Sequence, residues 1–269
     1  RHRMIQIRIW DWPTRIFHWT LAILIVALVI TGNVGGNAMV WHFRCGYAVL
    51  SLLIFRLIWG FCGGHWSRWR QLACTPELIR QYFKSSMPQT PFLGHNPLGS
   101  LAVIAMLALL ALQVSTGLIS DDEISNAGPL VSLVSGSSVS LATSWHKGFG
   151  KTFILLLVAV HLLAILWYLV KKKQNLTLAM LKGDKTSATP ADSSKDGPAN
   201  WLLAVLCILV SAGLVYALIN LGATAVLAPI FNDKIHSTTT RKIDSLVCTF
   251  KTHHLSVRGI VCRRHVGRA

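Results

Sequence analysis

Five long apolar runs determine what this chain of 269 residues can fold into. Each run is close to the roughly 20 residues that a helix needs to cross about 30 Å of hydrocarbon. Backbone polar groups inside a bilayer must be hydrogen-bonded within the protein, and a single helix satisfies them all. The sequence therefore predicts an all-α integral membrane protein, a four-helix transmembrane bundle followed by a fifth C-terminal transmembrane helix. The runs are Phe17 to Val34, Val40 to Phe61, Pro97 to Leu118, Trp145 to Val170 and Trp201 to Leu221.

The fourth run carries two histidines, His146 and His161. In a regular helix this spacing is about 22 Å along the axis with a net rotation of only about 60°, so both imidazoles face one side. A histidine inside a bilayer is costly unless it pairs, conducts or binds a cofactor. Two histidines on one face at different depths indicate two stacked metal or haem centres.

The first two runs supply a partner for each of these histidines. Counted from the outer ends of their runs, His18 and His161 both lie sixteen residues deep, which is about 24 Å of helix. His42 and His146 each directly follow a tryptophan at an outer end. The four histidines therefore form an inner pair, His18 with His161, and an outer pair, His42 with His146. An interfacial, snorkelling role for His18 is the alternative.

Two imidazoles per site are typical of haem b. Neutral imidazoles on the two sides of a flat macrocycle hold a six-coordinate haem, which suits electron transfer. Zinc sites use three or four protein ligands, so two histidines fall short. The chain has no CxxCH motif, and we therefore expect two non-covalent haems.

Other polar residues near the runs have less certain roles. Arg56, about four turns into the second run, needs an anion such as a haem propionate or a lipid phosphate; snorkelling to the surface is the alternative. His65 and His95 lie outside the apolar runs and are assigned no cofactor. Thr75 and Pro76 predict a short interfacial helix in the loop before the third run.

Positive charge is concentrated on one side of the predicted membrane. Lys and Arg cluster before the first run, between the second and third, and after the fourth, whereas the opposite loops lack them. This pattern predicts a multi-pass protein of the bacterial inner (plasma) membrane with a cytoplasmic N-terminus. The formal net charge of +16 then reflects topology, and no nucleic-acid partner is expected. Asp121, Asp122 and Glu123 in an outer loop are candidates for docking a basic partner, or are simply solvated.

Composition divides the chain into four segments. Residues 1–173 form the dihaem four-helix domain, and residues 174–199 read as a polar, flexible linker. Residues 200–222 form the fifth transmembrane helix, interpreted as an anchor for the linker or a docking element. Residues 223–269 form a basic tail that we expect to be disordered, with a basic arm for an acidic partner as the alternative. The first run lacks a cleavage pattern and is expected to be retained rather than removed as a signal peptide.

An ordered set of motifs over about residues 5–172 resembles a known family, the bacterial cytochrome b561 type, which includes the cytochrome b subunits of nickel–iron hydrogenases. The resemblance implies a four-helix bundle with two b haems and electron exchange between the membrane quinone pool and a redox partner, either a hydrogenase-like protein or a c-type cytochrome, in a respiratory chain. The motifs are WDWPTRIFHW, WHFRCGY, FRLIWGF, GHNPLGSL and WHKGFGKTFILLLVAVHLL.

Three other functions remain open at this stage. A haem-free transporter would pass a transition metal along the histidines, although the first four runs contain no Asp or Glu to line a path. A membrane anchor for a soluble enzyme would make the histidines incidental. A stand-alone superoxide-to-quinone oxidoreductase would keep the haems and make the protein itself the enzyme, rather than an electron-transfer component of an oxidoreductase system.

Overall fold

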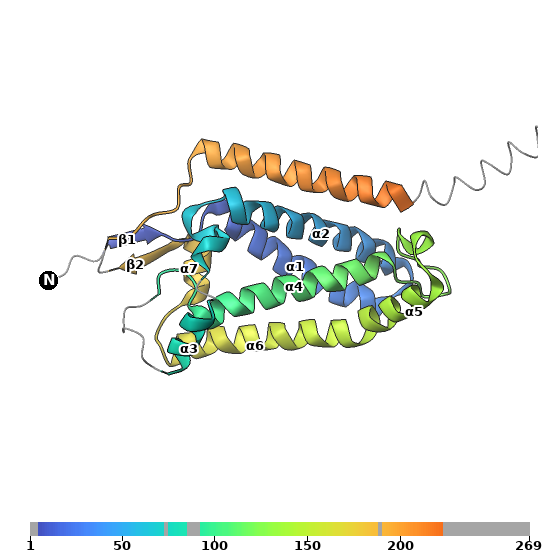
Figure 1. Ribbon diagram of the computed structural model, residues 1–269, viewed down its shortest axis with the longest axis horizontal. Coiled ribbons are helices and arrows are strands. Elements are labelled where there is room, and N and C mark those ends of the chain that lie inside the picture. The colour runs from blue at the N-terminus through green and yellow to red at the C-terminus, as the bar shows by residue number, and fades with distance from the viewer. Residues whose placement is uncertain (1–4, 73–74, 85–91, 188–189, 223–269) are drawn as a thin grey trace, which may run out of the picture. The chain divides into compact units, whose positions relative to one another are not determined.

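The structure is a computed structural model that describes residues 5–72, 75–84, 92–187 and 190–222. In these residues five helices are long and apolar enough to cross a membrane (Figure 1). This confirms the predicted all-α membrane architecture. The basic tail predicted for residues 223–269 lies outside the described residues. The five spans are α1 (Trp12–Val34), α2 (Met39–Cys62), α4 (Pro97–Leu118), the helical stretch Gly136–Val170 and a fifth helix, Pro198–Gly222.

Local sequence explains where the first helices begin and end. The Asp11 carboxylate accepts a hydrogen bond of 2.9 Å from the backbone N–H of Thr14 and so caps α1. Asn96 caps α4 in the same way through the N–H of Gly99, at 2.7 Å. Between α1 and α2, Gly35 and Gly36 have φ of 67° and 53°, which glycine adopts without strain. A 3₁₀ turn, η1 (Gly36–Ala38), then leads into α2.

The fourth span has three parts. It begins with α5 (Gly136–Ser144), continues through a π-helical segment, η5 (Trp145–Gly150), and ends as α6 (Lys151–Val170). The sequence prediction placed its outer end at Trp145, which is wrong. The Ser135 hydroxyl accepts from the N–H of Ser138 at 3.4 Å, and this cap starts the helix before the apolar run does.

Close packing follows the order α1 with α2, α2 with α4, and α4 with α6. The fifth helix adds to the same hydrophobic core and therefore packs on the bundle. Helix α6 contributes no fully buried residue, so most of its apolar surface is available to lipid. The buried core consists of Phe17 and Leu21 of α1, Val49, Leu53, Phe55 and Trp59 of α2, Leu110 of α4, and Ala204 and Cys207 of the fifth helix.

We call the end of the bundle where α1 begins the proximal end and the opposite end the distal end. At the proximal end lie a short strand, β1 (Ile5–Arg8), and the antiparallel strand β2 (Asp184–Ser187) (Figure 1). The described residues between α2 and α4 form three short elements, and the third of them, α3, confirms that a short helix begins at Thr75 and Pro76. They are η2 (His65–Ser67), η3 (Trp69–Gln71) and α3 (Pro76–Phe83). At the distal end, η4 (Val131–Leu133) precedes α5.

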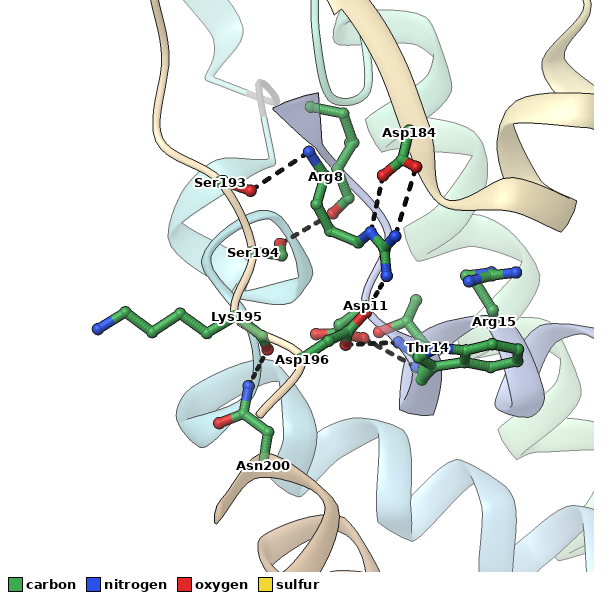
Figure 2. A network of polar contacts seen from close by, with 12 residues as sticks. Arg8, Asp11, Thr14, Arg15, Asp184, Ser193, Ser194, Lys195, Asp196 and Asn200 are labelled. Atoms are coloured by element: carbon green, nitrogen blue, oxygen red, sulfur yellow. Dashed lines mark hydrogen bonds and ion pairs between the residues drawn. The ribbon is translucent and has the colours of Figure 1, made fainter. Parts of the chain in front are cut away.

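The segment expected to be a flexible linker contains two regular elements and contacts to the N-terminal strand. It contains helix α7 (Leu176–Lys182) and strand β2. Arg8 of β1 forms ion pairs with Asp184, at 2.7 Å, and with Asp196, at 2.6 Å (Figure 2). The Ser194 hydroxyl donates to the carbonyl oxygen of Ile9 at 2.9 Å. The polar residues of this segment therefore bond to the N-terminal strand, which composition does not reveal.

Candidate functional site

The structure brings the four intramembrane histidines together as two pairs. At the proximal end, the ring centres of His18 on α1 and His161 on α6 are 6.4 Å apart. Towards the distal end, those of His42 on α2 and His146 on η5 are 6.1 Å apart. Neither pair joins two helices of the closely packed series. Each pair therefore spans the interior between helices that are not in close contact.

These separations fit one metal ion between each pair of rings. Two imidazoles on opposite sides of one metal, each with a metal–nitrogen bond of about 2 Å, have ring centres about 6.3 Å apart. Among the described residues, no group of three or more His, Cys, Asp or Glu side chains is placed to hold a metal ion. Two axial imidazoles with the remaining ligands supplied by a macrocycle are the donor set of a six-coordinate haem.

Hydrogen bonds orient the distal rings. The Nδ1 atom of His146 is 2.8 Å from the backbone carbonyl oxygen of Gln113, and Nδ1 of His42 is 3.1 Å from that of Leu28. With Nδ1 donating its proton to a carbonyl, Nε2 carries the lone pair that binds a metal. In the proximal pair, Nδ1 of His18 is buried without a hydrogen-bond partner among the described residues.

Two glycines leave room for the distal histidines. A Cβ atom on Gly117 of α4 would lie 2.7 Å from Cε1 of His146, and one on Gly32 of α1 would lie 3.1 Å from Cε1 of His42. Both distances are shorter than ordinary carbon–carbon contacts of about 3.5–4.0 Å. The distal rings can therefore occupy these positions only because both residues lack a side chain.

The π-helical segment η5 contains His146. A π turn rotates less per residue than an α turn, and it reduces the net rotation between His146 and His161 from the value of a regular helix. The side-chain amide of Gln113 donates to the carbonyl oxygen of His146 at 2.8 Å, so α4 contacts this residue at both its ring and its backbone. Sequence reasoning missed Gln113, although a lone amide in an apolar span is a signal of a buried polar contact.

Arg56 is buried beside the proximal end of the core. Only 5% of its surface is exposed, and its guanidinium carbon lies 4.4 Å from the ring centre of Trp69. Its Nη1 atom is buried with no hydrogen-bond partner among the described residues. Arg56 therefore does not snorkel to the surface, and its free donor could bind an anion.

His95 and Lys185 also lie near the proximal pair. Burial, followed by the charges of Lys185 and Arg56 and then by His161 and His18, lowers the pKa of His95 to about 4. Burial also lowers the pKa of Lys185. The sequence assigned His95 no cofactor because it lies outside the apolar runs, and it gave no signal for Lys185.

Asp11 connects the start of α1 to the end of α2. One of its carboxylate oxygens accepts from the indole N–H of Trp59 at 3.3 Å, from the N–H of Gly64 at 3.0 Å and from the hydroxyl of Ser67 at 2.9 Å. The other caps α1. Asp11 is fully buried, so this residue fixes the proximal ends of two helices that carry histidines.

The acidic distal loop is organised by its own hydrogen bonds. The Asp122 carboxylate accepts from the side chain of Asn126 and from three backbone N–H groups. These bonds, the Asn126 side chain first, lower the pKa of Asp122. Asp121 and Glu123 line a shallow surface depression together with Lys147. The loop thus presents charged groups at the distal surface.

Known proteins resemble the part of the chain that contains the four histidines. A family model described as prokaryotic cytochrome b561 matches residues 9–183. The chain is 25% identical over 218 residues to a probable Ni/Fe-hydrogenase B-type cytochrome subunit of Azotobacter vinelandii, an alignment that covers 67% of this chain and 89% of that protein. It is 25% identical over 214 residues to the subunit of the same description from Cupriavidus necator, with 66% and 86% covered.

A more distant relative is the probable Ni/Fe-hydrogenase 1 B-type cytochrome subunit of Escherichia coli K12. It is 24% identical over 135 residues, which cover 40% of this chain and 57% of that protein. No solved structure gives a significant match. The family match includes all four histidines and ends at the turn before β2.

Proposed function

Because the chain belongs to the prokaryotic cytochrome b561 family, we propose that it is a dihaem cytochrome b that carries electrons between the quinone pool and a redox partner protein. The chain is a multi-pass membrane protein and a b-type cytochrome. The number of haems, their ligands, the quinone and the partner are parts of the proposal. The observation that carries it is the spacing of both histidine pairs, 6.4 and 6.1 Å between ring centres.

In this proposal His18 and His161 hold the proximal haem, and His42 and His146 hold the distal one. A six-coordinate haem with two imidazole ligands accepts and releases one electron with little change in geometry. The protein's own contribution is to fix the ligands before the cofactor binds. The Gln113 and Leu28 carbonyls set the tautomer of the distal rings, and the apolar helices exclude water from the path between the two pairs.

The partner is proposed from the relatives and from the distal surface. The similar proteins are described as hydrogenase B-type cytochrome subunits, and a hydrogenase-like protein or a c-type cytochrome is the expected partner. In this proposal the protein lies in the inner membrane with its N-terminus in the cytoplasm. The distal end of the bundle then faces the outside of that membrane. Asp121 and Glu123, which line the distal surface depression, would then meet a basic partner surface.

Haem stoichiometry and single substitutions test the ligand assignment. The purified chain should contain two haems b per polypeptide, measured by pyridine extraction, and show a b-type reduced-minus-oxidised spectrum. His161→Ala should lose the proximal haem and His146→Ala the distal one. His65→Ala is the matched control, because His65 lies outside the spans and faces Asp192 at 3.8 Å. It should keep both haems.

The results separate this proposal from the other functions. A folded chain without haem would favour a metal transporter or an anchor, and metal binding to the purified protein would distinguish these two. Two haems that are reduced by superoxide and reoxidised by a quinone analogue, with no partner present, would favour the stand-alone oxidoreductase. Loss of both haems in His65→Ala would contradict the ligand assignment.

A further inference from the structure

Three basic side chains from separate segments lie close enough at the proximal end of the bundle for their charges to act on one another. Arg56 comes from α2, His95 precedes the cap of α4, and Lys185 belongs to β2. The charges of Lys185, Arg56 and the two proximal histidines all act on His95. The ring of His95 also contacts Trp10, at 4.7 Å between ring centres. Residues far apart in the sequence therefore build one basic cluster, which we name the proximal basic cluster.

This cluster has too little negative charge around it. Asp11 is the carboxylate whose charge acts on Arg56, but both of its oxygens already accept hydrogen bonds from the ends of α1 and α2. Within the described part of the chain, Lys185 has no carboxylate partner, and its Nζ donates to the carbonyl oxygen of Leu93 at 2.8 Å. Buried cations are normally paired with anions because desolvation is costly.

The cluster also has donors ready for an anion. Nη1 of Arg56 is buried and unpartnered in the described residues, on a side chain that is only 5% exposed. The first turn of α4, a helix of 22 residues, adds partial positive charge next to His95. A guanidinium, an ammonium and an imidazole together match two carboxylates in both charge and hydrogen-bonding capacity.

We propose that Arg56, His95 and Lys185 bind the two carboxylates of the proximal haem. This inference rests on the proposed function and adds residues to that site. A lipid phosphate carries similar chemistry, but the charges of His18 and His161 reach His95, and the carboxylates of a haem held by these two histidines would be anions at the same end of the bundle. In this arrangement the cluster favours the reduced proximal haem, because nearby positive charge stabilises the form with one more electron.

The test uses the purified, haem-containing full chain. Haem is labelled with ¹³C at its carboxyl carbons through a labelled precursor, and reduced-minus-oxidised infrared spectra are recorded together with a redox titration. Lys185→Gln and His95→Gln should each shift the label-sensitive carboxylate bands. Lys185→Gln, which removes a positive charge, should also lower one midpoint potential and leave the other unchanged. Lys182→Gln is the matched control, because Lys182 is an exposed lysine at the end of α7, two residues before β2; it should change neither readout.

Each outcome has a defined meaning. Carboxylate bands and potentials that are identical in wild type and in both variants would overturn this inference and leave the proposed function intact. Label-insensitive shifts in the phosphate region, with loss of bound phospholipid, would identify a lipid site and overturn it too. Absence of haem from the wild-type chain would refute the proposed function itself. If Lys185→Gln does not fold, His95→Gln decides the outcome by the carboxylate bands.

Discussion

Replacing Gly117 with alanine should weaken haem binding at the distal site and spare the proximal one. The new methyl group would lie 2.7 Å from Cε1 of His146 and 3.1 Å from its Nδ1. Ordinary carbon–carbon contacts are about 3.5–4.0 Å, so the ring has to move by roughly 1 Å. Its hydrogen bond to the Gln113 carbonyl is 2.8 Å long and would be lost by such a movement.

The size of the effect follows from these two costs. Overpacking of a filled interior costs about 1–3 kcal/mol, and loss of one hydrogen bond costs about 1 kcal/mol. Their sum of about 2–4 kcal/mol corresponds to roughly 30- to 1000-fold weaker binding. Gly32→Ala should have a smaller effect, because its methyl group would lie 3.1 Å from His42. Gly46→Ala is the control, since a Cβ there has no atom within 4 Å.

The assay is haem content per polypeptide together with the two midpoint potentials. Gly117→Ala should approach one haem per chain after purification, with the remaining potential unchanged. Gly46→Ala should match wild type. Two haems with unaltered potentials in Gly117→Ala, in a protein that keeps its helical content, would refute the steric argument. A loss of equal size in Gly46→Ala would show that any added methyl group in the spans has this effect.

Three further predictions concern the ends of the bundle. Asp11→Ala should lower the free energy of unfolding by about 3–5 kcal/mol, because it leaves buried hydrogen-bond donors of α2 and the following loop unpaired. Asp192→Ala, at an exposed carboxylate, should leave stability unchanged, and equal melting temperatures of the two variants would contradict this prediction. Arg8→Gln should weaken the pairing of β1 with β2 by about 1 kcal/mol, measured as faster amide exchange at residues 184–187. Unchanged exchange would show that the ion pairs with Asp184 and Asp196 do not hold the strand. Hydrogen bonds lower the pKa of Asp122, so its stabilisation of the distal loop is complete above the ordinary aspartate pKa and is lost only as pH falls through the lowered value. Amide protection at residues 124–126 should therefore be the same at pH 5 and pH 7, and a loss of protection at pH 5 would refute this assignment.

The spans could be predicted from the sequence because a helix that crosses the hydrocarbon has to be apolar over about 20 residues. The predicted third run, Pro97 to Leu118, has the same limits as α4. The start of the fourth span was missed because residues 136–144 are small and polar, and their helix depends on the Ser135 cap. The π-helical segment was missed for a different reason, since periodicity assumes a constant rotation per residue.

Long-range contacts explain the other differences between the sequence prediction and the structure. The pairing of β1 with β2 joins residues about 180 positions apart, and composition alone reads the second strand as linker. His95 and Lys185 reach the proximal end only through this pairing and through the loop before α4. Asp11 could have been found, because an aspartate two residues before Pro13 is an N-cap signature.

Each histidine pair joins an early helix to the last helix of the four-helix bundle. This limits the stage of synthesis at which a haem could bind. His18 and His42 are made more than 100 residues before His146 and His161, which is on the order of ten seconds of translation at typical rates. During this interval each proposed haem site has only one of its two proposed ligands, so neither could hold a six-coordinate haem. Nascent chains arrested before residue 145 should therefore lack stably bound haem, and cofactor insertion should follow the arrival of the fourth span in the membrane.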